Sequence, residues 1–291
     1  MQLGMIHKLV ELFQQAFDQL EVSISMNRIE HMAVIVHKAM TVQARNFHNL
    51  EHVFNFIDQT NPIQTLAALF HDIVYYQVDP GFLPEIHTVI DAYILEEEEA
   101  LSIRKDIPAE ERMVWMTMAI FNLEAGEQLT PAGGLNEFLS ALMMNKLLEG
   151  DLTEKDLLRM TLCIEATIPF RGVTESGESH FHILARRLRK VGEIHKIAFT
   201  WPEIDEAVQL AVQFANKDVE NFSESDAGRF LDNTWKLLPE MNVALRSREV
   251  YSVREYRLAI QRMEAFLSKL DPDNVFHSYR GVPSDEEYGK M

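Results

Sequence analysis

The chain has 291 residues, 47% of them hydrophobic, which is enough to bury a substantial core in one large or two small domains. Its formal net charge of −18 at pH 7 argues against a nucleic-acid polymer as the main partner, because binding a polymer's phosphates depends on concentrated Lys and Arg. The single cysteine, Cys163, excludes an intrachain disulfide, and no apolar run approaches the roughly 20 residues that cross a bilayer, so we expect a cytoplasmic protein that does not enter membranes.

Apolar residues recur at helical spacing through nearly the whole chain. The first such segment is typical of an amphipathic core helix, because a signal peptide would be basic and then continuously apolar. Polar residues that cap helices precede two later segments: Asn61, which is followed by a proline, and Thr153 in a capping box. The predicted helices cover residues 6–20, 26–40, 48–57, 63–71, 85–95, 109–121, 135–148, 154–164, 180–194, 204–215, 229–244 and 253–270.

No strand alternation is sustained beyond a few residues, and no fixed-period repeat or low-complexity linker is present. The predicted fold class is therefore all-α, with a single helical domain over residues 1–270. An irregular tail, which contains two prolines and several charges, is predicted for residues 271–291. The oligomeric state is open.

Three histidines and an aspartate stand out within these helical patterns. His48 and His52 are four residues apart, so on a helix both project from one face. His71 and Asp72 are adjacent at the end of a second apolar run, where their side chains can flank a metal ion beside the helix end. Imidazole and carboxylate ligands together suit divalent ions such as manganese, iron, magnesium, nickel, cobalt or zinc. The pattern predicts a metal site suited to hydrolysis.

The segments Phe-His-Asn-Leu-Glu-His (47–52) and Ala-Leu-Phe-His-Asp (68–72) resemble the HD superfamily of metal-dependent phosphohydrolases. The resemblance is strong over residues 45–76 and is to the branch that contains predicted metal-dependent HD proteins and shares its arrangement with cyclic-nucleotide phosphodiesterases. It implies a single HD-domain-like helical bundle. It also implies that His52, His71 and Asp72 are metal ligands and that a late aspartate completes the set.

Asp218 is the candidate for the late aspartate, because it ends an apolar run and its carboxylate would be partly buried. Asp205 and Asp226 are alternatives in more polar stretches. By the same resemblance His48 occupies the position of a proton donor, for which an imidazole is suited because its pKa lies near neutrality. Asp72 would bridge to a second ion and orient the nucleophilic water.

Two further residues are predicted to bind the substrate: Asn49 through its amide, and Arg171, which stands before a glycine and could clamp a phosphate bidentately. The chain departs from the family pattern, because it has no histidine at the place where many members have a further ligand. Glu165 stands there and could serve a second ion. His180 and His182 align with no family ligand. The expected number of metal ions is therefore one or two.

The expected function is hydrolysis of a nucleotide or another small phosphate ester by metal-activated water. A small phosphorylated substrate is the expected partner. Two alternatives are open at this point. One is a catalytically silent HD-like module that binds a nucleotide or a protein, and the other is an HD-type oxygenase with a di-iron centre.

Overall fold

Helix α8 (Glu154–Ala166) lies at the centre of the computed structural model, which describes all residues except 1, 58, 98–99, 175–176 and 247–250. It packs against α4 (Pro62–Phe70), α7 (Leu135–Leu148) and α10 (Trp201–Asp218). A helix that contacts neighbours on several sides must be apolar around most of its circumference, and α8 is buried from Met160 to Ala166. Its Thr161 is satisfied by a hydrogen bond from the Asn145 amide of α7.

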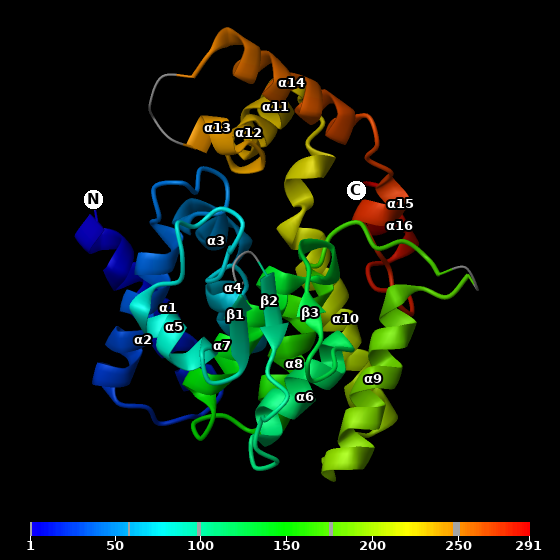
Figure 1. Ribbon diagram of the computed structural model, residues 1–291. Coiled ribbons are helices and arrows are strands. Elements are labelled where there is room, and N and C mark those ends of the chain that lie inside the picture. Colours follow the sequence, from blue (N-terminus) through cyan, green and yellow to red (C-terminus); the bar gives the residue numbers. More distant parts are fainter. Residues whose placement is uncertain (1, 58, 98–99, 175–176, 247–250) are drawn as a thin grey trace.

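The other long helices surround this centre in a shell (Figure 1). On one side α1 (Gln2–Gln19) packs against α2 (Met26–Met40) and α4, and on the other α6 (Arg112–Phe121) packs against α7 and α9 (His180–His195). The shorter elements of this part of the chain are α3 (Leu50–Phe56), α5 (Pro84–Ile90) and the 3₁₀ turn η1 (Pro131–Gly133). We call α1 to α10 the helical body; one continuous hydrophobic core runs through it.

A small antiparallel sheet interrupts the helical pattern. Strand β1 (Ile94–Glu97) pairs with β2 (Ala100–Ile103), and β2 pairs with β3 (Gln128–Leu129). The prediction of a helix over 85–95 is wrong at its end, because α5 stops at Ile90. In β2, Leu101 and Ile103 are buried and alternate with less buried residues, and this period of two favours a strand. The chain is mostly helical, as predicted, but it is not purely α.

The helices after α10 form a second group, which lies above the body in Figure 1. We call them the upper helices. They have a hydrophobic core of their own, built on Leu237, Leu238, Ala259 and Met263. Their elements follow the 3₁₀ turn η2 (Glu220–Ser223) and are α11 (Ala227–Trp235), α12 (Leu237–Met241), α13 (Val243–Arg246) and α14 (Val253–Leu267).

The C-terminal segment returns from the upper helices to the body and contains two short helices, α15 (Pro272–Val275) and α16 (Asp285–Tyr288). Asn216 of α10 exchanges two hydrogen bonds with the backbone of His277, at 2.7 and 2.8 Å. The Tyr279 hydroxyl donates to Asp205 of the same helix at 3.0 Å. These contacts fasten the tail to α10. Within the described part of the chain, no helix has the length and apolar character to cross a membrane.

Candidate metal centre

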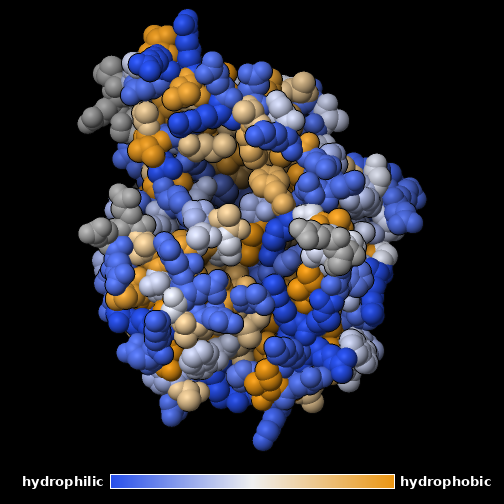
Figure 2. Space-filling model, turned by 45° about the vertical axis from the view of Figure 1, so that its right-hand side comes forward, coloured by the Kyte–Doolittle hydropathy of each residue, from blue (hydrophilic) through white to orange (hydrophobic). Residues whose placement is uncertain are grey.

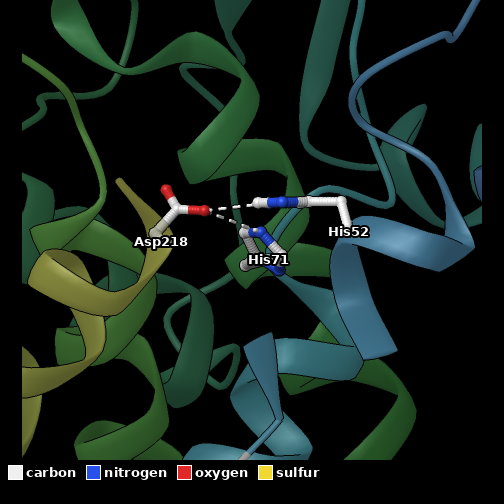
Figure 3. A group of neighbouring side chains, drawn as sticks. All are labelled: His52, His71 and Asp218. Carbon is white, nitrogen blue, oxygen red and sulfur yellow. Dashed lines mark hydrogen bonds and ion pairs between the residues drawn. The ribbon is translucent and has the colours of Figure 1, made fainter. Parts of the chain in front are cut away.

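Three helices bring the candidate ligands together, as Figure 3 shows. His52 projects from α3, His71 stands at the C-terminal cap of α4, and Asp218 is the last residue of α10. Helix α3 can begin at Leu50 because the Asn49 side chain accepts hydrogen bonds from the next free backbone N–H groups, a standard N-terminal cap. His48 therefore precedes the helix. The prediction of a helix that contains both His48 and His52 is wrong at its first residues.

The ligand atoms converge on one point. His52 Nε2 lies 3.0 Å from Asp218 Oδ1, and His71 Nε2 lies 3.5 Å from the same oxygen. Asp72 Oδ2 joins them at 3.0 Å from His71 Nε2 and 3.9 Å from His52 Nε2. A group of two imidazoles and a carboxylate, His52, His71 and Asp218, could hold a metal ion.

The hydrogen bonding of these side chains fits an ion. His71 Nδ1 donates to the carbonyl of Ala68 at 2.8 Å, which leaves Nε2 with its lone pair facing the centre. His71 Nε2 and Asp72 Oδ2 are both buried, and although they lie 3.0 Å apart, neither forms a hydrogen bond of good geometry. Buried polar atoms are rarely left unsatisfied in folded proteins. A cation bound between them would satisfy both.

Charge also accumulates at this point. Burial disfavours the ionised carboxylate of Asp72, but the neighbouring His71 and His48 outweigh burial and hold the pKa of this group well below its usual range. Burial opposes protonation of His71, yet the charges of Asp72 and Asp218 raise its pKa well above 6.5, so a proton holds the Nε2 position until a cation displaces it. The carboxylates therefore stay ionised and attract positive charge, as the ligands of a cation must.

Arg45 fixes the position of the His-Asp pair. Its side chain is fully buried, and it forms a bidentate ion pair with Asp79 through contacts of 2.8 and 2.5 Å. A third donor, Nη1, reaches the backbone carbonyl of Asp72 at 2.5 Å. Bidentate Arg–carboxylate pairs define geometry closely. Arg45 thereby ties the segment before His48 to the turn that carries Asp72.

His48 is held by Glu240 of α12, a residue that sequence reasoning missed. His48 Nδ1 lies 2.6 Å from Glu240 Oε2, and the other carboxylate oxygen accepts the backbone N–H groups of Asn46 and Phe47 at 2.6 and 2.7 Å. Burial lowers the pKa of His48, but the charges of Asp72 and Glu240 raise it by a larger amount, so the net shift of this pKa is upward. The only local signal of Glu240 is a carboxylate enclosed by Leu237, Leu238, Pro239 and Met241.

Two cavities open on the centre. The larger, about 440 Å³, is lined by polar side chains that include His52, Asp218, Lys217 and Lys236. The second, about 370 Å³, lies between the body and the upper helices and is lined by His48, Asp72 and several aromatic rings. We call it the aromatic cavity. Figure 2 shows the surface hollowed between these two parts of the molecule.

The remaining candidate residues have other contacts. The Asn49 amide caps α3 and donates to the carbonyl of Asn46 at 2.7 Å. Arg171 lines neither cavity; its guanidinium bonds Glu165 at 2.8 Å. Glu165 is wholly buried, away from the ligand group, and also accepts His180 at 2.9 Å and Arg187 at 3.1 Å.

The other polar residues that the sequence singled out also lie outside the centre. His182 contacts the Ser179 hydroxyl at 2.7 Å through Nδ1. Asp205 accepts the Tyr279 hydroxyl, and Asp226 caps α11. Of the three late aspartates that were considered, the structure brings Asp218 alone to the two histidines.

Comparison with known proteins adds no relative. No protein-family model matches the chain, and neither a curated protein nor a solved structure is similar to it. The functional assignment therefore depends on the geometry of the site.

Proposed function

We propose that this protein is a metal-dependent hydrolase of small phosphate esters, built on an HD-like helical bundle. The observation that carries the proposal is the convergence of His52, His71, Asp72 and Asp218 beside a histidine that is held by a carboxylate and faces a cavity. Two imidazoles and two carboxylates are a donor set for a divalent ion with open positions. The buried Nε2 of His71 and Oδ2 of Asp72 face each other at 3.0 Å without a well-formed hydrogen bond, and this supports a cation between them.

His52, His71, Asp72 and Asp218 would hold the first ion, which we propose to be Mn, Fe, Mg, Ni, Co or Zn. Asp72 is the residue placed to bridge to a second ion. Glu165 is already neutralised by Arg171, His180 and Arg187 and is a poor candidate for that role. When bound, such an ion would lower the pKa of a water molecule and polarise a phosphoryl oxygen.

The residues around it move the protons. The water oxygen bonds to phosphorus while the bond from phosphorus to the alcohol oxygen breaks. His48 gives its Nε2 proton to that departing oxygen, because Nδ1 is occupied by Glu240 and the carboxylate keeps the ring protonated. Asp72 orients the attacking water, and the water's proton passes to solvent. His48 returns to its charged form by taking a proton from solvent.

The test is turnover of p-nitrophenyl phosphate with added manganese by protein purified without chelator. The expected result is hydrolysis that is lost, together with bound metal, in Asp218→Asn. The matched control is Glu206→Gln, an exposed carboxylate on the same helix that should leave both unchanged. Two irons per chain with a near-ultraviolet charge-transfer band would overturn hydrolysis in favour of oxygenation. Tight nucleotide binding without turnover would overturn it in favour of a silent binding module.

A further inference from the structure

The aromatic cavity lies on the side of the centre from which the alcohol departs. Its lining includes the proton donor His48 and two of the proposed ligands, Asp72 and Asp218. A proton donor must stand beside the oxygen that it protonates. If phosphorus is placed at the ion, the alcohol of the substrate must therefore extend into this cavity. The chemistry of the cavity then selects the alcohol.

One wall of the cavity is made of phenylalanine rings from three separate segments. The ring centroids of Phe170 and Phe266 lie 5.6 Å apart, and those of Phe222 and Phe266 lie 6.2 Å apart, both pairs edge to face. Phenylalanine offers a ligand no hydrogen bond, only apolar surface and the negative face of its ring. Such a wall suits an alkylated or aromatic group, and it attracts cations through the ring quadrupole.

The charges in the cavity are all of one sign apart from His48. In the described part of the chain, the residues that line it include four carboxylic acids but no lysine or arginine. Additional phosphate groups would be repelled here. The part of the substrate that enters this cavity should therefore carry no further phosphate groups, because these need arginine or lysine contacts.

Glu137, near the start of α7, is the carboxylate of this cavity that has no side-chain partner among the described residues; it accepts only its own backbone N–H. Glu240 is occupied by His48, and Asp72 and Asp218 belong to the centre. The Glu137 carboxylate has no hydrogen bond or ion pair with another side chain among the described residues, and burial together with the charge of Asp72 raises its pKa to about 7. Arg171 acts on it only over distance, because that guanidinium is bound to Glu165.

On the basis of the proposed hydrolase function, we infer that the substrate is a phosphate ester of an alcohol that carries a positively charged nitrogen. Glu137 pairs with this nitrogen, and the phenylalanine wall covers its alkyl groups. The buried Gln77 Nε2, which lines the same cavity without a hydrogen-bond partner, can donate to an oxygen of the ligand. A cation in the cavity would give Glu137 the charged partner that no described side chain supplies.

The test compares a cationic ligand with its neutral carbon isostere. Choline and 3,3-dimethylbutan-1-ol have the same shape and differ in one charge, and neither is hydrolysed. Calorimetric titration of the protein should give about tenfold tighter binding of choline, the scale of a desolvated cation–π contact with a paired carboxylate. The kcat/KM values of the two phosphate esters should differ in the same direction. Glu137→Gln should remove most of the preference, and Glu206→Gln should retain it.

The outcomes separate this inference from the function on which it rests. Equal affinity for the two alcohols in the unmodified protein overturns the inference, even if p-nitrophenyl phosphate is hydrolysed. A choline preference that survives Glu137→Gln overturns the role of that carboxylate. A preference for choline without turnover of any phosphate ester supports the cavity assignment and contradicts the hydrolase proposal.

Discussion

The helical body and the upper helices contribute different things to the site. All four proposed ligands lie in the body, at the ends or on the surface of helices that share one large core. The upper helices supply Glu240, which holds His48, and part of the aromatic cavity. Among their described residues, the core is built on four buried side chains. The difference suggests that metal binding and proton transfer are supported by separate parts of the molecule. A substitution can then weaken metal binding without affecting proton transfer, or proton transfer without affecting metal binding.

The largest effect is expected at the ligands. Asp72→Ala removes a carboxylate that faces both histidines and should abolish metal binding and hydrolysis together, since the centre loses a ligand and the group that orients water. Metal content by mass spectrometry and turnover are the measurements. Retention of both in this variant would contradict the ligand assignment.

Loss of the proton donor should separate chemistry from metal. His48→Asn keeps a donor for Glu240 but cannot transfer a proton, so metal content should stay normal while kcat falls by about 10²–10⁴-fold. The effect should be smallest for p-nitrophenyl phosphate, whose leaving group needs little protonation, and larger for an alkyl phosphate. Equal losses for both substrates would count against the assigned role.

Glu240→Gln tests the contribution of the upper helices without removing the acceptor for the backbone of Asn46 and Phe47. We expect unchanged metal content and a fall in kcat of roughly 10–100-fold, the scale of losing a carboxylate that orients an imidazole in a metal site. The negative charge of Glu240 raises the pKa of His48. Without this charge His48 should lose its proton at a lower pH, so the fall in kcat with rising pH should begin at a lower pH in the variant than in the unmodified protein. A pH profile of kcat that does not move would refute this link.

The small core is the next target. Leu238 is 2% exposed within it, and Leu238→Ala should destabilise the upper helices by about 2–5 kcal/mol. Hydrogen exchange should accelerate in α11 to α14 while exchange in α8 and the affinity for the ion stay unchanged. Cys163→Ala in α8 is the matched change in the large core and should affect global stability instead.

The last effect concerns the tail and leaves the site unchanged. Burial lowers the pKa of His277 to about 4, from 6.5, and the positive charges of His180 and Arg171 act in the same direction. The unfolded chain therefore binds this proton first, so stability is complete above pH 6.5 and decreases as pH falls toward 4, by roughly 3 kcal/mol in total. His277→Leu should flatten this part of the stability curve in denaturant titrations. An unchanged slope would contradict the assignment to His277.

Site residues could be predicted from the sequence where their partners lie close along the chain, and were missed where the partners lie far apart. His52, His71 and Asp72 stand in two short motifs, and Asp218 was recognisable because it ends an apolar run. Glu240 was not, since it lies 192 residues from His48 and nothing local pairs them. Arg171 was predicted to face the substrate, but a buried carboxylate six residues away binds its guanidinium. Most helices followed from periodicity, but the single helix predicted over 229–244 is wrong, because the structure divides it into α11, α12 and α13, and the tail predicted to be irregular contains α15 and α16. The hairpin of β1 and β2, with only four residues a strand, was too short for its pattern to stand out.

The central claim is that one cation binds His52, His71, Asp72 and Asp218 at a single point. A crystal structure of metal-loaded protein, with anomalous data collected at the absorption edge of the ion, tests it most directly. The account predicts an anomalous peak within about 2.0–2.5 Å of ligand atoms from both histidines, Asp72 and Asp218. A peak elsewhere, or none between these side chains in protein that retains its metal, would contradict it.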